Sequence, residues 1–471
     1  MTDTRYARQT VLSHWDQNLL RRAHVVIVGA GALGGFISLG LAALGIGTLT
    51  LVDDSMIAAD AASPVGVDRF RFLVGASAVS RRAATLALML GAINPEVSVR
   101  SIPLRLRYDA MALSMPACHA LIEASGDPVS QRICARYARQ KGIPAFVGVA
   151  GASGGACAFV RDDENDIVVT AEGAPDIGVC EVIAGAMIEE VRKQLMPLPG
   201  DGAAVAGPFS YDLNQQTRFG TTTHPPSTPR LATSFGNVLI IGAGALGTYV
   251  ALGLALSHGD SISRLTIVDP DIVEETNLNR QVLYHDAVGQ PKAEVLARKL
   301  KLLQPGLNVM PDVGMVAAGH VEAADLSFLC VDNYAARAQV NQWAVKAGRP
   351  FINGGTSPFG GHVEVCAPGH TACLNCRLDV DRLAREQAGR RVRCGDAVEA
   401  GIVQTNMLIA GLMVCEAKLA HSAPLASAIE YDARAPARFG LRSARAACDC
   451  GQQLVDQKTA QQEMQNDHEP G

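Results

Sequence analysis

Residues 237–271 read NVLIIGAGALGTYVALGLALSHGDSISRLTIVDPD. An apolar run, a glycine cluster, a second apolar run and a third apolar run with an acidic end give the order strand, tight turn, helix, strand. Gly242, Gly244 and Gly247 lie where the chain must turn tightly and where backbone can approach a phosphate closely. Asp269 ends the second strand, where its carboxylate can accept hydrogen bonds from ribose hydroxyls. The stretch predicts a nucleotide-binding, Rossmann-like unit.

The same pattern occurs once more, at residues 24–54, which read HVVIVGAGALGGFISLGLAALGIGTLTLVDD. A repeat of this size indicates two duplicated domains rather than a solenoid. Alternating strands and helices follow each copy, so the predicted fold class is α/β, with two tandem, doubly wound Rossmann-like domains that form a pseudo-dimer. The expected boundaries are a first domain at 1–200, a linker at 201–234, a second domain at 235–451 and a disordered tail at 452–471.

The composition of the 471 residues is that of an ordinary globular protein, with 48% hydrophobic residues, 18% charged residues and a formal net charge of −5. The slightly acidic balance and the lack of a Lys/Arg stripe give no indication of nucleic-acid binding. Two uncharged stretches, 25–52 and 238–257, are long enough to span a bilayer. Their internal glycine clusters instead indicate a buried strand, a turn and a buried helix, so we expect no membrane segment. Without a secretory signal, and with twelve scattered cysteines, the expected location is the reducing cytoplasm.

The glycines alone do not separate ATP chemistry from hydride transfer, because NAD-dependent dehydrogenases have the same spacing. Three later motifs of the second repeat make that distinction. NLNRQ contains Asn277 and Arg280, GQPKA contains Lys292 at the start of a predicted helix, and CVDN places Asp332 and Asn333 at the end of a buried strand. Two cations would neutralise charge spreading over phosphate oxygens, and Asp332 would hold Mg²⁺. This set suits attack by a carboxylate on the α-phosphate of ATP.

These motifs resemble the ubiquitin-activating-enzyme-like family, the ThiF/MoeB/HesA superfamily. The resemblance covers nearly all of both repeats. It implies Asp269 as the ribose ligand, Asn277, Arg280 and Lys292 as ligands of the ATP phosphates, and Asp332 as the magnesium ligand. RYARQ at residues 5–9 resembles the opening segment of the family, which implies that Arg8 reaches into the ATP site of the neighbouring domain.

The first repeat lacks these motifs. With Asp53 aligned on Asp269, the positions of Asn277, Arg280 and Lys292 hold Ala61, Pro64 and Ala76. An alignment with gaps would bring Arg69 or Arg81 to these positions, but no GxPK motif remains. Asp127 remains at a strand end, but proline follows it in place of asparagine. The resemblance is therefore to the two-domain form of the family, with an inactive N-terminal domain and an active C-terminal one.

Cys373 and Cys376 have the spacing of a zinc-binding pair, and Cys448 with Cys450 offers a second pair. In the family the second pair is CxxC, whereas here it is CxC. Two unrelated reduced pairs, or a disulfide formed on isolation, are the alternatives to Zn²⁺.

Cys394 stands in RRVRCGDAVEAGIVQ, where three arginines would favour the nucleophilic thiolate. The resemblance implies that this cysteine forms a thioester, although the family's cysteine lies three residues closer to the following EAG. A non-essential exposed thiol is the alternative. The interval from Cys376 to Gly401 is too short for a separate catalytic-cysteine domain, which indicates a compact, bacterial version.

The predicted function is ATP-dependent adenylation of the C-terminal carboxylate of a ubiquitin-like protein, thioester formation on Cys394 and transfer to a conjugating enzyme. Three alternatives remain: a sulfur-carrier adenylyltransferase for thiamine or molybdopterin synthesis, an NAD-dependent oxidoreductase, and a subunit that only docks a partner. The sequence leaves open an oligomer beyond the internal pseudo-dimer.

Overall fold

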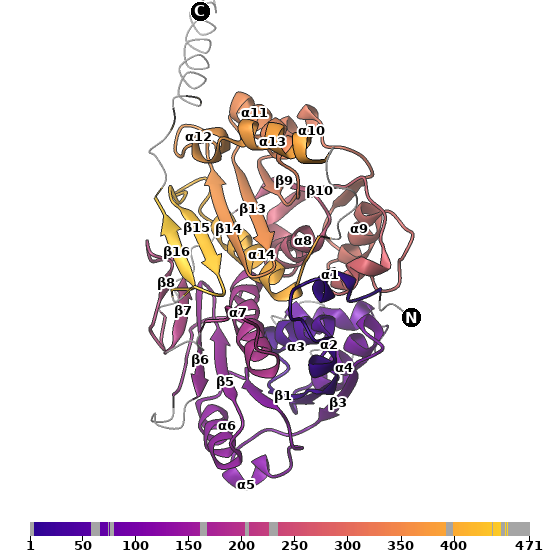
Figure 1. Ribbon diagram of the computed structural model, residues 1–471, viewed down its shortest axis with the longest axis vertical. Helices are drawn as coiled ribbons and strands as arrows, with labels where there is room; N and C mark the ends of the chain where they lie inside the picture. Colours follow the sequence, from indigo (N-terminus) through magenta and orange to yellow (C-terminus); the bar gives the residue numbers. More distant parts are fainter. Residues whose placement is uncertain are drawn as a thin grey trace, which may run out of the picture.

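The computed structural model describes residues 4–57, 66–73, 75, 80–160, 167–202, 207–225, 234–391, 399–435, 437–443, 448 and 450. Two halves of similar architecture lie one above the other, with the N-terminal half at the bottom of Figure 1 and the C-terminal half at the top. Each half contains an eight-stranded sheet with helices on its faces. The expected fold class, two α/β domains of the Rossmann-like kind, is confirmed.

The first sheet has the strand order β3-β2-β1-β4-β5-β6-β7-β8. Its first five strands in this order are parallel, and the remaining neighbours pair antiparallel. The strands are β1 (His24–Val28), β2 (Thr48–Val52), β3 (Ser98–Ile102), β4 (Ala120–Glu123), β5 (Ala145–Ala150), β6 (Gly154–Val160), β7 (Phe209–Asp212) and β8 (Phe219–Gly220).

The second sheet repeats this topology in the order β11-β10-β9-β12-β13-β14-β15-β16, with the same change from parallel to antiparallel pairing. The strand order changes direction between β1 and β4 in the first sheet and between β9 and β12 in the second. Open α/β sheets bind ligands at such a point. The strands are β9 (Gly236–Ile241), β10 (Ile262–Val268), β11 (Val309–Asp312), β12 (Leu326–Leu329), β13 (Phe351–Ser357), β14 (Gly360–Cys366), β15 (Ala428–Asp432) and β16 (Phe439–Arg442).

The helices also repeat between the halves. Those of the first half are α1 (Ala7–Thr10), α2 (Gln17–Arg22), α3 (Ala32–Leu44), η1 (Gly66–Leu73), α4 (Arg82–Ile93), α5 (Asp109–Ala112), α6 (Pro128–Lys141) and α7 (Ile177–Leu195). Those of the second half are α8 (Ala245–His258), η2 (Gly259–Ser261), η3 (Glu275–Asn277), η4 (Val282–Tyr284), α9 (Lys292–Leu303), α10 (Ala318–Ala323), α11 (Tyr334–Ala347), α12 (Leu374–Leu378), α13 (Val380–Arg391) and α14 (Val403–Ala417).

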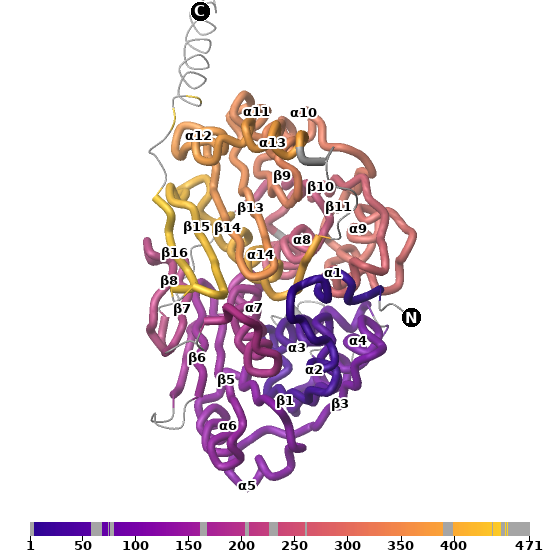
Figure 2. Tube along the Cα trace, in the orientation of Figure 1, coloured from indigo at the N-terminus to yellow at the C-terminus, as the bar shows by residue number. Residues whose placement is uncertain are grey.

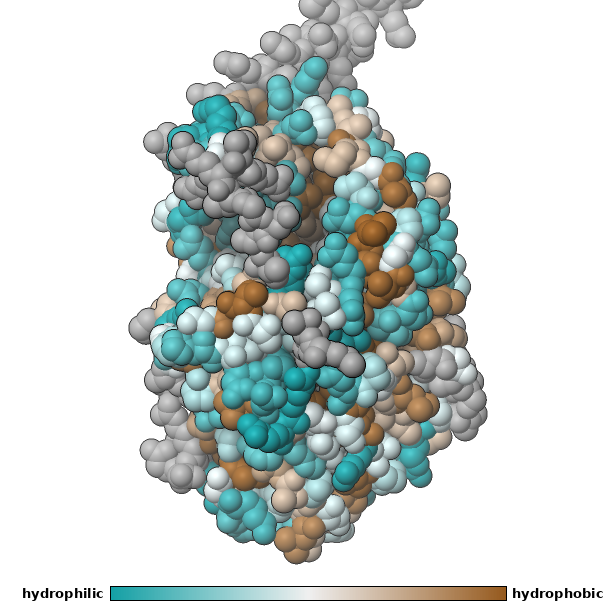
Figure 3. All heavy atoms as spheres, turned by 45° about the vertical axis from the view of Figure 1, so that its right-hand side comes forward, coloured by the Kyte–Doolittle hydropathy of each residue, from teal (hydrophilic) through white to brown (hydrophobic). Residues whose placement is uncertain are grey.

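The largest apolar core runs through both halves and includes α3, α7, α8 and α14. All of α3 is buried, which explains why the sequence around it carries no charge. Among the described residues, no helix combines the length and the apolar character that crossing a membrane requires. On the face shown in Figure 3, hydrophobic side chains form small separate patches on a mostly hydrophilic surface, as is normal for a globular protein.

The halves meet at the crossing of α7 and α14, which glycine makes possible. A Cβ atom on Gly185 of α7 would lie 2.6 Å from the Cβ of Leu408, and one on Gly411 of α14 would lie 2.4 Å from the carbonyl oxygen of Gly178. Related ion pairs reach in both directions across this interface. Arg218 pairs with Glu416 at 2.7 Å, and Arg438 pairs with Glu190 at 3.2 Å. The contact therefore has the approximate twofold symmetry of a dimer.

Residues 201–234 differ from the linker that the sequence predicts. The segment contains β7 and β8, which complete the first sheet. Phe219 of β8 stacks on Phe439 of β16 with ring centroids 4.4 Å apart, so the far edges of the two sheets are in contact. The predicted tail, 452–471, lies outside the described residues.

Candidate nucleotide site

The loop between β9 and α8 has a backbone conformation that residues with a Cβ atom could not adopt at Gly242 and Gly247. Gly242 has a φ of +96°, and a Cβ there would lie 2.8 Å from the carbonyl oxygen of Cys330. A Cβ on Gly247 would lie 1.9 Å from the carbonyl oxygen of Gly242. Gly244 is the N-cap of α8 and supplies no capping side chain, so N–H groups at the helix start are available to an anion.

Asp269 braces this loop. Its carboxylate accepts hydrogen bonds from the backbone N–H groups of Ala243 at 2.6 Å and Asp271 at 2.8 Å, and burial raises its pKa. Asp53 does the same in the first half, with Ala30 at 2.7 Å and Ser55 at 2.6 Å. Because both halves share this bracing role, the glycines and the aspartate do not by themselves distinguish the two sites.

The cationic side chains lie beyond β10 in the second half. Asn277 is buried, and its side-chain oxygen accepts the N–H of Glu274 at 3.0 Å, which fixes the η3 turn. Lys292 is the first residue of α9, and its Nζ lies 2.8 Å from the exposed carboxylate of Asp271. Asn277 thus stabilises the backbone of its own turn, whereas Lys292 is paired with the solvent-exposed carboxylate of Asp271.

Arg280 is partly buried and is held by neutral groups. Its guanidinium donates to the carbonyl oxygen of Thr276 at 2.9 Å and to the side-chain oxygen of Asn279 at 2.8 Å. Among the described residues no carboxylate lies within ion-pair distance of it. Burial, followed by the nearby positive charge of Arg8, lowers the pKa of Arg280 to about 10. A cation that has lost much of its water and has no paired carboxylate would be stabilised by an anion.

Arg8, in the first half, contacts the segment that leads into α14 of the second half. Its guanidinium donates to the carbonyl oxygen of Glu399 at 3.2 Å, and its own carbonyl oxygen accepts the N–H of Gly401 at 2.8 Å. Figure 2 shows α1, in indigo, lying along the boundary between the two halves. The structure thus brings Arg8 and Arg280 together from different halves.

Asp332 and Asn333 follow β12, which pairs with β9, so they lie next to the glycine loop. Asp332 is exposed. The side-chain oxygen of Asn333 instead caps α11 by accepting the N–H of Ala336 at 2.8 Å. Asp332 is therefore free to meet a metal ion, and Asn333 has a structural partner already.

The register of the first half corrects the sequence alignment. The bridge between Met56 and Arg81 corresponds to the bridge between Ile272 and Pro291, so Arg82 matches Lys292. Ala76 does not, because the first-half loop is longer and a fixed offset from Asp53 fails. Arg82 is paired at 2.6 Å with the buried carboxylate of Asp68, which leaves less of its charge for a ligand.

Asp127 is likewise misaligned by the sequence. It caps α6 by accepting the N–H of Val129 at 2.9 Å, as Asn333 caps α11. The first-half residue that matches Asp332 is then Gly126, which has a φ of +74°. The first half has no carboxylate at that position.

The four cysteines predicted to bind zinc lie together, with all of their sulfur atoms within 4.8 Å of one another. The sulfurs of Cys376 and Cys450 are 3.7 Å apart, and the sulfur of Cys448 accepts the backbone N–H of Cys373 at 3.2 Å. A tetrahedron with Zn–S bonds of about 2.3 Å separates its sulfurs by about 3.8 Å. The cluster fits a zinc ion, and the CxC spacing does not prevent it. Cys394 lies outside the described residues.

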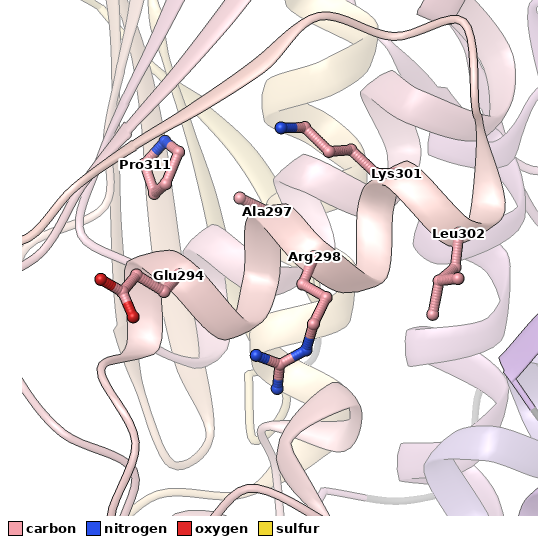
Figure 4. Close-up of a pocket in the computed structure, with 6 residues that line it drawn as sticks. All are labelled: Glu294, Ala297, Arg298, Lys301, Leu302 and Pro311. Carbon is pink, nitrogen blue, oxygen red and sulfur yellow. The ribbon is translucent and has the colours of Figure 1, made fainter.

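A surface groove on α9 contains none of the predicted site residues (Figure 4). It is lined by Glu294, Ala297, Arg298, Lys301, Leu302 and Pro311. Two buried residues that sequence reasoning missed, Asn279 and Gln9, do belong to the site, because Asn279 bonds to Arg280 and Gln9 bonds to Asn279. Both residues lie within sequence motifs, NLNRQ and RYARQ, whose other residues were the predicted ligands.

The comparisons with known proteins agree with this duplication. A family model described as the ThiF family matches residues 6–175 and again residues 213–424. The NEDD8-activating enzyme E1 catalytic subunit of Arabidopsis thaliana is 33% identical over 158 residues, which is 30% of this chain and 34% of that protein. The sulfur carrier protein ThiS adenylyltransferase of Escherichia coli is 34% identical over 145 residues, which is 30% of this chain and 57% of that protein.

The adenylyltransferase and sulfurtransferase MOCS3 of Sus scrofa is 36% identical over 152 residues, which is 31% of this chain and 32% of that protein. The chain thus spans between about a third and about three fifths of the length of these relatives. Among solved structures, E. coli MccB with MccA-N7isoASN aligns at 24% identity and a TM-score of 0.39, covering 47% of this chain and 68% of that one.

Proposed function

Because the chain belongs to the ThiF family, we propose that its second half uses ATP to adenylate the C-terminal carboxylate of a ubiquitin-like protein. The observation that carries this proposal is the partly buried guanidinium of Arg280, which donates to neutral oxygens and has no carboxylate within ion-pair distance among the described residues. Such a group fits a phosphate that loses a leaving group and gains charge on its oxygens. A hydride-transfer site would give Arg280 and Lys292 no role.

In the proposed reaction, a carboxylate oxygen of the partner attacks the α-phosphorus of ATP, and pyrophosphate leaves with the electron pair of the broken P–O bond. Arg280, Lys292 and Arg8 would stabilise negative charge on the phosphates, and the start of α8 would hold them through backbone N–H groups. Asp269 would bind the ribose. Asp332 would hold Mg²⁺, which supplies charge neutralisation when bound.

We assign the second step to Cys394. Its thiolate would attack the carbonyl carbon of the acyl-adenylate, AMP would leave, and the thioester formed would pass the acyl group to a conjugating enzyme. The zinc ion held by Cys373, Cys376, Cys448 and Cys450 would be structural, because all four ligand positions are filled by protein.

Mass spectrometry tests both steps. The chain is incubated with ATP, Mg²⁺ and a ubiquitin-like protein from the same genome. The Cys394→Ala variant should yield the partner with the added mass of an adenylate, because the acyl group has no thiol to move to. The wild-type chain should give a covalent adduct that free thiol removes. An adduct that survives in Cys394→Ala would defeat the thioester assignment, and no adenylate in either chain would defeat the proposal.

A second candidate function is adenylation of a sulfur-carrier protein. The similarity to ThiS adenylyltransferase and to MOCS3 favours it, since these relatives match as well as the E1 subunits do. Both functions share the adenylate. A thiocarboxylate on the partner after addition of a sulfur donor would favour this second function, and a thioester transferable to a conjugating enzyme would favour the first.

A further inference from the structure

A chain of buried amide side chains connects the first half to Arg280. Asn279, which is fully buried, accepts from the guanidinium of Arg280 at 2.8 Å and donates to the side-chain oxygen of Gln9 at 3.1 Å. Gln9 is also fully buried and donates to the side-chain oxygen of Gln17 at 2.6 Å. Three amides from two halves of the chain therefore support one guanidinium.

The groups at the ends of this chain fix the direction of every hydrogen bond. Arg280 can only donate, and so can the indole N–H of Trp15, which donates to the oxygen of Gln17 at 3.0 Å. Gln9 and Gln17 both turn their remaining N–H groups to the carbonyl oxygen of Leu44, at 3.0 and 3.1 Å. No amide can be reversed without placing two oxygens or two N–H groups face to face. The oxygen of Asn279 must therefore point to Arg280.

Asn279 also holds the backbone segment that leads into α14. Its second N–H donates to the carbonyl oxygen of Gly401 at 3.1 Å. A Cβ on Gly401 would lie 3.0 Å from the Nε of Arg280, so this backbone packs directly on the guanidinium. Arg280 is thus confined by Asn279 on one side and by Gly401 on another.

The three amide side chains of Asn279, Gln9 and Gln17, here called the amide relay, carry no charge, so they hold Arg280 without cancelling its positive charge. Arg82, at the position in the first half that matches Lys292, is neutralised by Asp68. Arg280 is held instead by an amide oxygen and a carbonyl oxygen. A carboxylate would hold the guanidinium as firmly but would cancel the charge that an anionic ligand needs.

We propose that Asn279, oriented by Gln9 of the first half, is a positioning residue that holds the guanidinium of Arg280 against an anionic ligand without neutralising it. The ligand class is the phosphate chain of a nucleoside triphosphate, so the inference rests on the proposed function. The N-terminal half then contributes to the site twice, through the charge of Arg8 and through the neutral amides of Gln9 and Gln17.

Calorimetric titration of the full chain with ATP and Mg²⁺ tests this inference. Loss of a hydrogen bond to a charged group should weaken ATP binding about tenfold in Asn279→Ala. In a chain that already carries Arg280→Gln, the same substitution should change ATP binding less than about twofold, because Asn279 acts through Arg280. Asn308→Ala, at an exposed position of the same half, is the control and should leave binding unchanged.

Gln9→Leu provides a second variant of similar volume, to be used if Asn279→Ala does not fold. It removes the acceptor for Asn279 from the other half and should weaken ATP binding by about threefold to tenfold, again only when Arg280 is present. Equal losses with and without Arg280 would mean a merely structural role and would overturn the relay. A wild-type chain that binds no ATP would instead refute the proposed function.

Discussion

At the scale of single residues, the two halves differ in how each cation is balanced. Arg82 has the buried carboxylate of Asp68, Lys292 has the exposed carboxylate of Asp271, and Arg280 has neutral oxygens. Attraction between opposite charges grows as water is excluded, so an ion pair with a buried partner leaves little charge for a ligand. The second half thus keeps Arg280 and Lys292 without a buried counter-ion, whereas in the first half Arg82, which matches Lys292, is neutralised by Asp68.

A second residue-scale feature is Glu181 of α7, which is fully buried and has no hydrogen-bond partner among the described residues. Its carboxylate faces Gly253 of α8, at a helix position where the other half places Met407 against Gly40. Burial, and then the charge of Asp176, raise the pKa of Glu181 well above its usual range. Glu181 is therefore protonated in the folded chain over a range of pH in which it is ionised in the unfolded chain.

Replacing Glu181 by Gln should therefore change the pH dependence of stability. Because the folded state binds the extra proton, the wild-type chain loses stability as pH rises above the usual Glu range, by about 1.4 kcal/mol for each pH unit. Glu181→Gln should remove this loss, and the two chains should differ least near pH 4. Urea unfolding at several pH values measures the effect, and parallel curves for the two chains would contradict it.

At the residue scale, the motifs of the second repeat could be located from sequence because each one fixes its own spacing. Arg280 follows β10, Lys292 begins α9, and Asp332 follows β12, which pairs with β9. That the three bind one nucleotide stays a prediction. The match of Lys292 to Ala76 failed because the loop lengths differ between the halves, which no fixed offset can represent. Asn279 and Gln9 were missed because a buried amide has no signature apart from its partners.

At the scale of elements, the approach of α7 to α14 decides how the halves fit. Gly185 and Gly411 let backbone and side chains of the partner helix come closer than any Cβ would permit. The polar contacts around the crossing, such as the bond from Gln404 to Glu189 at 2.8 Å, depend on this separation. The glycines are visible in the sequence, but the residues that pack on them could not be predicted, because they lie on a helix more than two hundred residues away.

Gly185→Val should separate these helices and lower the free energy of unfolding by about 1–3 kcal/mol or more, because the core has no room for the added methyl groups. Gly91→Ala in α4 is the matched control. A Cβ on Gly91 meets no atom within 4 Å, so that change should stabilise the chain by about 0.5–1 kcal/mol through helix propensity. Chemical unfolding of both variants decides the matter, and a neutral Gly185→Val would show that the crossing tolerates a larger separation.

The cysteine cluster joins α12 to the end of the described chain, at Cys448 and Cys450. We predict one zinc ion per chain after purification under reducing conditions. Cys448→Ser should lower the zinc content substantially, whereas Cys118→Ser, at a half-buried position outside the cluster, should not. Elemental analysis measures the content, and a metal-free wild-type chain would remove the zinc assignment.

Element-scale prediction was good for the buried strands and helices around each glycine loop, whose apolar runs are long and regular. It failed at β7 and β8, which were expected to be linker. These strands are four and two residues long, and they lie among glycine, proline and polar residues, so no periodicity develops. Pairing with β6 and stacking on β16, rather than local preference, make them strands.

At the scale of the whole molecule, we propose that the duplicated fold forms one site to which both halves contribute. The second half would supply the glycine loop, Arg280, Lys292 and Asp332. The first half would supply Arg8 and the amides that contact Asn279. Its own matching positions hold Gly126 in place of Asp332 and Arg82, which is paired with Asp68, in place of Lys292. This division of roles is what the proposed adenylation predicts for a chain with one working site.

ATP–pyrophosphate exchange in the presence of the ubiquitin-like partner tests this central claim most directly, with two matched variants. Asp332→Asn should abolish exchange, because it removes the carboxylate proposed to hold Mg²⁺ in the second half. Asp127→Asn should leave exchange unchanged, because Asn caps α6 as well as Asp does and the first half takes no part in the chemistry. Exchange that persists in Asp332→Asn, or that is lost in Asp127→Asn, would contradict a single adenylation site in the second half.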